Sequence, residues 1–421
     1  MGVAFPFLLA ATVNAAETEV SSTKRRDDDM LKEVLQWATE NGAYISPKIE
    51  SRHIVGDLSG IFAKEPMEKG EVVSTIPWHL IIGPPKGSPR GFCAGVEAAL
   101  AILKKNPAEQ NPYEKYLISR PKNFHPLFWS KRGRGVLRKI MGYDLPPSDE
   151  DFDLKNIVKD YECDQFDGAD VEDDLMQQAL MLTLTRTEGE KFDHLVPFND
   201  LINHAATDEE YTADPKFEIG THYQIVARRD LNADEEIRNS YNKCEWCESF
   251  SNSPTLDHMF VTPHIFEHYG FIEPVPQRWI VPSSRLFFDV FKEEKSDTLK
   301  AKFAVPPSPY GIQYLTKEIT RLEESANLLD AEASKHLISA IEMNTIREYR
   351  QAILTAYKLA LEETGTNNTI VSDEVWYRDR GRWWEEPDVN GGIPQKTTYH
   401  YHLSEGRPIR RRVLRIERDR L

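Results

Sequence analysis

The sequence has little cysteine and no excess of positive charge. Only 4 of its 421 residues are cysteine, which is too few for a fold held together mainly by disulfides. Lys and Arg total 52 against 68 Asp and Glu, which gives a formal net charge of −16. Because nucleic-acid binding depends on basic side chains that neutralise phosphates, this balance argues against such binding across the whole surface.

Long hydrophobic runs are also missing, so the sequence predicts no membrane-spanning helix. The first residues, MGVAFPFLLAATVNAAE, do contain a short apolar core and a small-residue cleavage site, although no Lys or Arg precedes the core. Residues 1–16 are therefore a candidate signal peptide, which would make Asn367 a candidate glycosylation site. The compartment stays open between the secretory pathway and the cytoplasm, nucleus or plastid.

Two local features could serve binding. Residues 407–421, RPIRRRVLRIERDRL, hold seven arginines and two acids, and could bind an acidic partner or form a solvated tail. Cys244 and Cys247 form a CxxC pair that nearby histidines could complete as a zinc site. A local disulfide or two unpaired thiols are simpler alternatives, and we expect no metal.

The length predicts two or three folded units, and the residue patterns alternate between strands and helices. The patterns predict a helix over 30–42, short strands over 56–80, mainly helices over 92–186, and strands again over 195–241. A last long helix is predicted to begin with a capping box at Thr345 and Glu348 and to end at Gly365. Strand-rich segments thus bracket a helical insert.

One strand-rich segment, LVPFNDLINH at 195–204, carries unexpected polar residues. Asn199, Asp200, Asn203 and His204 lie within an apolar run. Buried polar side chains need hydrogen-bond partners, so this segment belongs either to a satisfied structural turn or to a binding site.

Seven short motifs resolve this choice when they are taken together and in order. They are WATENGA at 37–43, SGIFAKEPMEKGEVVSTIP at 59–77, NPYEKYL at 111–117, TLTR at 183–186, LVPFNDLINHA at 195–205, EEIRNSY at 235–241 and HYGFIE at 268–273. In this order they resemble SET-domain protein methyltransferases, in the branch of Rubisco large-subunit methyltransferase and actin-histidine methyltransferase. The resemblance extends over about Leu31 to Gly365.

The resemblance implies an α+β fold. This is the SET-domain β-clip fold of small twisted sheets with a pseudoknot, interrupted by a helical insert and followed by a helical C-terminal domain. The expected units are 1–16 as signal peptide, 27–91 as N-terminal helix and first SET part, 92–186 as helical insert, 187–275 as second SET part with the CxxC, 289–365 as helical substrate-binding-like domain, and 366–421 as C-terminal extension.

The resemblance also implies S-adenosylmethionine as cofactor. Methyl transfer from this sulfonium is an in-line displacement, so the protein mainly has to position two reactants and exclude water. Gly60 would let the backbone approach the cofactor closely, and the guanidinium of Arg186 would suit its carboxylate. The implied cofactor-binding residues are Asp57, Leu58, Ser59, Arg186, Asp200, Asn203 and His204.

Tyr241 matches the position of the catalytic tyrosine in this family, where its phenol would orient the methyl or the attacking nitrogen. Tyr269 and Phe271 would line the substrate channel, which can shield an uncharged amine or imidazole from water and can also attract a cationic lysine. The sequence departs from the family between Tyr241 and HYGFIE, where an insert carries the CxxC and Thr262 takes an expected contact position.

These residues predict a protein-lysine methyltransferase that acts on a non-histone protein. Histidine methylation is the close variant, and a SET-fold binding module without activity is the second alternative. A secreted interaction protein that uses its Arg-rich tail is the third. The substrate protein, the number of methyl groups added and the oligomeric state are left open by the sequence.

Overall fold

The computed structural model describes residues 29–365, apart from short gaps, together with 402–404 and 407–409. The gaps are 56–57, 85–90, 143–144, 146, 148–153, 162, 167–169, 189–193, 206–209, 240, 242–261, 282–283, 285, 294–295, 297 and 304–306. The candidate signal peptide, the candidate glycosylation site, the CxxC pair and most of the Arg-rich tail therefore lie outside the described residues.

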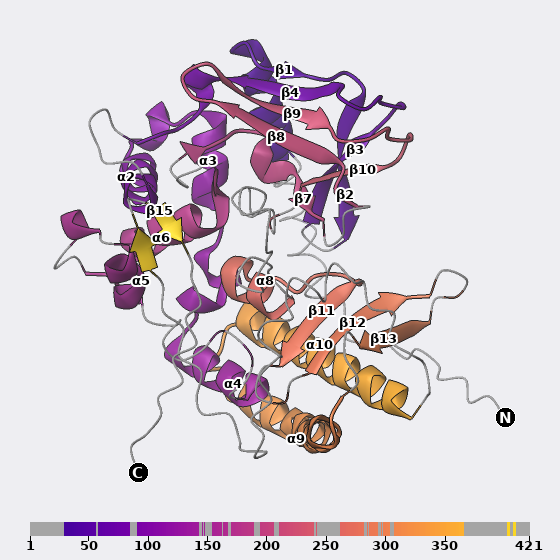
Figure 1. Cartoon of the computed structure of the whole chain (residues 1–421). Coiled ribbons are helices and arrows are strands. Elements are labelled where there is room, and N and C mark those ends of the chain that lie inside the picture. Colours follow the sequence, from indigo (N-terminus) through magenta and orange to yellow (C-terminus); the bar gives the residue numbers. More distant parts are fainter. Residues whose placement is uncertain are drawn as a thin grey trace.

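Two four-stranded sheets form one end of the molecule (Figure 1). The first has the order β1 (Tyr44–Ile45), β4 (Val72–Pro77), β9 (His222–Ala227) and β8 (Ala213–Glu218). The second has the order β2 (Ile49–Val55), β3 (Leu58–Ala63), β10 (Glu236–Asn239) and β7 (Asn203–His204). The parallel pairing of β7 with β10 places Asn203 opposite Arg238 and His204 opposite Asn239, which brings two of the sequence motifs together.

Helices separate the two strand-rich parts of the chain. The N-terminal helix covers residues 29–40, close to the range that the sequence predicts. After β4 comes the short 3-10 turn η1 (Trp78–Leu80). The insert contains the helices α2 (Phe92–Leu103), α3 (Pro112–Ser119), α4 (Lys131–Met141), α5 (Leu154–Asp160) and α6 (Asp174–Arg186). Its 3-10 turns are η2 (Pro107–Glu109), η3 (Lys122–Phe124), η4 (Pro126–Phe128) and η5 (Asp164–Phe166). After α6 come β5 (Thr187–Glu188), β6 (His194–Leu195) and η6 (Asn199–Leu201).

A disulfide joins Cys93 in α2 to Cys163, which lies 70 residues further along the chain. The sequence analysis does not predict this pair, because the only cysteines with a local motif are Cys244 and Cys247. The bridge ties α2 to the segment between α5 and η5, and α2 in turn packs along α6.

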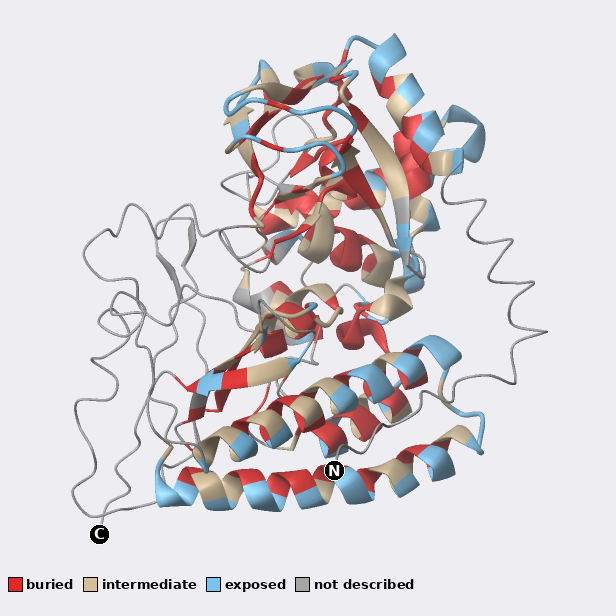
Figure 2. Ribbon diagram, turned by 90° about the vertical axis from the view of Figure 1, so that its right-hand side faces the viewer, coloured by how far each residue is buried: buried red, intermediate tan, exposed pale blue. Residues whose placement is uncertain are grey.

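The C-terminal half begins with α8 (Thr262–Tyr269) and contains a three-stranded antiparallel sheet that the sequence analysis does not predict. The sheet consists of β11 (Gln277–Val281), β12 (Leu286–Lys292) and β13 (Leu299–Phe303). Two long helices follow, α9 (Pro309–Ala333) and α10 (Ala340–Thr364), and both carry buried and exposed stripes along their length (Figure 2). The strands β14 (His402–Ser404) and β15 (Arg407–Ile409) pair near the end of the chain.

The helix α10 begins earlier than the sequence predicts. Its N-cap is Ser339, whose side chain accepts a hydrogen bond from the backbone of Glu342, so the capping box predicted at Thr345 and Glu348 is wrong. Gly365 does follow its last residue as predicted. The α+β architecture of small sheets, a helical insert and C-terminal helices is confirmed. Among the helices of the described ranges, none is both long and apolar enough to cross a bilayer.

Candidate active site

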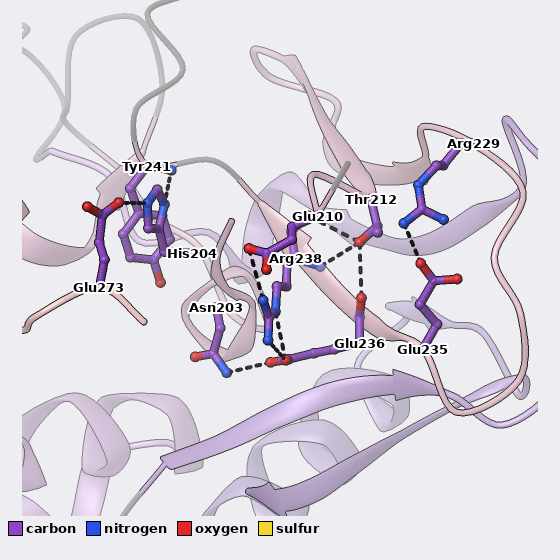
Figure 3. Close-up of polar contacts among 10 residues, drawn as sticks. All are labelled: Asn203, His204, Glu210, Thr212, Arg229, Glu235, Glu236, Arg238, Tyr241 and Glu273. Atoms are coloured by element: carbon purple, nitrogen blue, oxygen red, sulfur yellow. Dashed lines mark hydrogen bonds and ion pairs between the residues drawn. The ribbon is translucent and has the colours of Figure 1, made fainter. Parts of the chain in front are cut away.

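Asn203, in β7, is held by two acceptors, one from β3 and one from β10. Its amide nitrogen Nδ2 donates to the backbone oxygen of Ser59 at 3.0 Å. It also donates to Oε1 of Glu236 at 2.8 Å (Figure 3). A carbonyl oxygen and a carboxylate can only accept, so both amide hydrogens are used. The side-chain oxygen Oδ1 is therefore the atom of Asn203 that can accept a hydrogen bond from a ligand.

Gly60 makes room for the contact between Asn203 and Glu236. A Cβ at this position would lie 2.6 Å from Oε1 of Glu236 and 3.0 Å from Nδ2 of Asn203. Close approach of its backbone to a cofactor stays a prediction. Gly60 orients Asn203 indirectly, by leaving that contact undisturbed.

Glu236 is balanced by Arg238 on the same strand. The guanidinium lies 2.6 Å from Oε2 of Glu236 and 3.1 Å from Oε2 of Glu210 (Figure 3). Burial opposes protonation of Arg238, but the bond to Glu236 prevails and raises its pKa. Arg238 thus pairs with the carboxylate that orients Asn203.

His204 makes a specific hydrogen bond through each ring nitrogen. Nδ1 accepts from the backbone N–H of Tyr241 at 3.0 Å, and Nε2 lies 2.8 Å from Oε1 of Glu273. The other carboxylate oxygen of Glu273 accepts from the hydroxyl of Thr262 at 2.6 Å. All three side chains, His204, Glu273 and Thr262, are buried.

Tyr241 is the centre of an aromatic cluster. Its hydroxyl donates to the backbone oxygen of Ile202 at 2.9 Å, and its ring lies 4.9 Å from Tyr269 and 6.2 Å from Phe271. The imidazole of His204 lies 5.2 Å from the same ring. The predicted catalytic tyrosine and both predicted channel residues are thus neighbours, although α8 and an insert separate them in sequence.

Arg186 and Asp200 form a second buried cluster with two tyrosines of α3. The hydroxyl of Tyr113 donates to Oδ2 of Asp200 at 2.8 Å, and Nη1 of Arg186 lies 3.8 Å from the same oxygen. Nη1 of Arg186 also reaches the hydroxyl of Tyr116, at 3.5 Å. Burial raises the pKa of Asp200, although Arg186 and Tyr113 oppose this effect.

One nitrogen of Arg186 is unsatisfied. Within the described residues, its Nε is buried and has no hydrogen-bond partner. Tyr116, Asp200 and Tyr241 all help to keep the guanidinium protonated, because their interaction outweighs the effect of burial and raises its pKa. A buried N–H of a permanent cation without an acceptor is costly. The pattern suits a site that an anionic group completes.

The structure thus brings the predicted residues together in two adjoining groups. The first group surrounds the pair β7 and β10 and contains Ser59 of β3, Asn203, His204, Tyr241, Tyr269 and Phe271. The second consists of Arg186 at the end of α6 and Asp200 in η6. Asp57 and the side chain of Leu58 lie outside the described residues. The sequence analysis missed Tyr113, Glu236 and Glu273, although each lies within a motif that it identified. In the described part of the chain, no group of three or more His, Cys, Asp or Glu is placed to hold a metal ion.

Comparison with known proteins adds one family match. A family model for the SET domain matches residues 59–242. The SET domain of LSMT bound to methyllysine and AdoHcy has 14% identity and a TM-score of 0.42, covering 86% of this chain and 98% of that chain. Rubisco LSMT bound to AdoMet has 15% identity and a TM-score of 0.41, covering 86% and 97%. A search of curated protein sequences finds no match.

Proposed function

We propose that residues 59–242, which match a family model for the SET domain, form the catalytic domain of an S-adenosylmethionine-dependent methyltransferase that modifies a lysine of a non-histone protein. The observation that carries the proposal is the convergence of Asn203, His204 and Tyr241 on one parallel strand pair. These residues come from two separate motifs, and the polar atoms that remain for a ligand match the charged groups of this cofactor.

Two contacts would hold the amino-acid end of the cofactor. The unsatisfied Nε of Arg186 would donate to the carboxylate, and Oδ1 of Asn203 would accept from the ammonium. When bound, S-adenosylmethionine supplies a methyl group activated by its sulfonium charge. Arg186 is already protonated and Asn203 already oriented, so little reorganisation is required on binding.

Tyr241 would position the reacting groups. Its hydroxyl proton points to the backbone oxygen of Ile202, so the oxygen can accept weak C–H hydrogen bonds from the methyl group. Tyr269 and Phe271 would surround the incoming side chain and exclude water from it. An aromatic enclosure attracts a cationic lysine more strongly than a neutral imidazole, which favours lysine over histidine as the target.

Cofactor binding is tested by titrating the full chain with S-adenosylmethionine in a calorimeter. We expect Asn203→Ala to weaken binding at least tenfold, equivalent to about 1.4 kcal/mol. The control is Asn106→Ala, which removes an exposed cap of η2 in the insert and should leave the affinity unchanged. Absence of heat and of thermal protection with the unmodified chain would refute the proposal.

Turnover is tested with tritiated S-adenosylmethionine and arrays of peptides that contain either lysine or histidine. We expect label on lysine peptides, and at least a tenfold slower transfer by Tyr241→Phe with unchanged cofactor affinity. Label on histidine peptides alone would replace lysine by histidine as the target. Cofactor binding without label on any peptide or protein extract would identify a binding module instead.

A further inference from the structure

Glu273 and Thr262 lie beyond the segment that matches the SET domain, yet they complete the surroundings of Tyr241. We propose that Glu273, supported by Thr262, is a positioning residue of the methyl transfer. It anchors the imidazole of His204 so that Nδ1 holds the backbone of Tyr241. This inference rests on the proposed function, because it assigns Tyr241 a role in that reaction.

The chain of hydrogen bonds has fixed donors at both ends. The backbone N–H of Arg278 donates to the hydroxyl oxygen of Thr262 at 3.1 Å, and Thr262 donates its own proton to Oε2 of Glu273 at 2.6 Å. At the other end, the backbone N–H of Tyr241 donates to Nδ1 of His204. A backbone N–H can only donate, so neither end of the chain can reverse its direction.

These directions assign the proton of His204. Nδ1 accepts from Tyr241 and therefore carries no hydrogen. Nε2 carries the proton and donates it to Oε1 of Glu273 at 2.8 Å. Glu273 thus accepts on both oxygens, and the ring is held as the neutral tautomer protonated at Nε2. Protonation of Nδ1 would set two donors against each other and release the backbone of Tyr241.

The imidazole of His204 holds the backbone of Tyr241 just beyond the end of β10. β10 ends at Asn239, which lies opposite His204 in the parallel pair. Two residues later, Tyr241 is held through its backbone by His204 and through its hydroxyl by Ile202. Both contacts come from the segment 202–204, so the position of the phenol depends on how firmly the imidazole ring is fixed.

Burial of these side chains makes the position of Tyr241 depend strongly on the anchoring of His204. Glu273 is 5% exposed, Thr262 is 0% exposed and His204 is 7% exposed, so water does not readily replace a lost partner. Removal of the Glu273 carboxylate would leave the Nε2–H of His204 and the hydroxyl of Thr262 without an acceptor. The ring would then rotate or exchange tautomers, and the Tyr241 backbone would lose its acceptor.

Three variants separate a positioning role from a purely structural one. Glu273→Leu keeps much of the volume but removes both acceptor oxygens. Glu273→Gln keeps one acceptor oxygen for His204, while its amide can donate to Thr262, so it serves as the conservative rescue. Thr262→Val removes the hydroxyl that donates to Glu273 and accepts from the backbone of Arg278, and leaves the Glu273 carboxylate in place for His204. The loss of methyl-transfer rate should therefore be largest for Glu273→Leu, smaller for Thr262→Val and smallest for Glu273→Gln.

The direct measurement is the histidine ring ¹⁵N spectrum of the full chain at pH 7, with the signals of His204 assigned through a His204→Gln variant. The unmodified protein should show His204 as a single tautomer protonated at Nε2. His125 is an internal reference, because its Nδ1 also accepts from a backbone N–H, that of Leu127. We expect Glu273→Leu to populate a second His204 tautomer and to leave the His125 signals in place.

The functional measurement compares transfer with cofactor affinity. We expect Glu273→Leu to slow methyl transfer to the peptide arrays at least tenfold, with less than a threefold change in the dissociation constant of S-adenosylmethionine. Glu273→Gln should restore both the tautomer and the transfer rate to within threefold. A single unchanged His204 tautomer or an unchanged transfer rate in Glu273→Leu would overturn the inference.

The two proposals fail in different ways. If the unmodified chain binds no S-adenosylmethionine, the proposed function is refuted and the assigned role of Glu273 falls with it. If the unmodified chain binds and transfers but the Glu273 variants behave like it, only the positioning role is refuted. If Glu273→Leu does not fold, Thr262→Val and Glu273→Gln decide the question, because an unchanged spectrum and rate in Thr262→Val would contradict the anchoring chain.

Discussion

The region around β7 and β10 and the region around α9 and α10 bury polar groups in different ways. In the first, side chains bond to one another in series, as in Asn203 with Glu236 and His204 with Glu273. In the second, Glu342 and Arg321 bond to the two ends of a neighbouring helix, α4. A series of side chains fixes the orientation of one final group, whereas contacts to helix ends fix the position of a whole element.

The helix α4 illustrates the second way. At its N-terminus, Glu342 of α10 accepts from the backbone N–H of Ser130 at 2.8 Å and from its hydroxyl at 2.9 Å. At its C-terminus, Arg321 of α9 donates to the backbone oxygens of Lys139 and Ile140. A negative charge meets the positive end of the helix dipole and a positive charge meets the negative end. The insert is thereby docked onto the C-terminal helices at both ends of α4.

The largest expected effect on stability comes from a third kind of contact, the disulfide in the insert. Loss of the Cys93–Cys163 disulfide in Cys93→Ser should lower the free energy of unfolding by about 4 kcal/mol, because the closed loop spans 70 residues. Urea unfolding measures this change. Since α2 packs along α6, which carries Arg186, cofactor affinity should fall as well.

The matched control is the unmodified protein after reduction, which should unfold at the same urea concentration as Cys93→Ser. Alkylation tests whether the disulfide is present in the native protein. If the native chain is alkylated at Cys93 and Cys163 before any reductant is added, the bridge is absent and the expected difference disappears.

Two glycines of α4 allow a test of the contact between Glu342 and the N-terminus of this helix. A Cβ at Gly133 would lie 2.6 Å from Oε2 of Glu342, whereas a Cβ at Gly135 meets nothing within 4 Å. Gly133→Ala should therefore displace Glu342 from Ser130 and lower the stability by about 2 kcal/mol. Gly135→Ala should raise it by up to about 1 kcal/mol, because alanine favours the helix.

Chemical denaturation of both variants gives the stability difference, and titration with S-adenosylmethionine tests the separation of the regions. We expect opposite signs of stability change and an unchanged cofactor affinity in both. Equal effects of the two alanines would contradict the docking role of Glu342. A weaker cofactor affinity in Gly133→Ala alone would show that helix docking and the active site are coupled.

The sequence predicted the location of the site better than the contacts that hold it. Short motifs preserve the local order of residues, so Asn203, His204 and Tyr241 could be assigned before the pairing of β7 with β10 was known. Glu236 and Glu273 lie in the same motifs, but their roles depend on partners 33 and 69 residues away. No local pattern reports which of several acidic residues faces a given amide or imidazole.

Contacts between residues far apart in sequence also explain why the disulfide and the start of α10 were not predicted. The Cys93–Cys163 bridge joins residues without a spacing motif. The start of α10 was predicted wrongly because Thr345 with Glu348 matches a capping pattern. The structure caps the helix at Ser339 instead, and the carboxylate of Glu342 bonds to Ser130.

His125 offers an effect that appears only on acidification, at a segment that borders both regions. The preceding turn, η3, contacts both α6 and α10. His125 itself is 2% exposed, and a Cβ at Gly270 would lie 2.9 Å from its Cα. Burial lowers the pKa of His125 from 6.5 to about 4, against an opposing contact with the backbone of His268.

This lowered pKa predicts that the folded protein loses stability as the pH falls through a defined range. Between pH 6.5 and 4 the unfolded chain binds a proton at this histidine that the folded chain does not, so stability is full above pH 6.5 and is lost as the pH falls toward 4. The loss from pH 7 to pH 5 should be about 2 kcal/mol. His125→Asn, which keeps an acceptor for the backbone of Leu127, should remove that share of the pH dependence.

Urea unfolding at pH 7 and pH 5 measures the difference, with His79→Asn as the control at an exposed histidine. The absolute stability of His125→Asn is not the readout, because the smaller side chain leaves a cavity at both pH values. Only the change between the two pH values isolates protonation. If His125→Asn and His79→Asn lose the same stability on acidification, the acid sensitivity resides in other groups, such as the paired carboxylates of either region, and His125 plays no part in it.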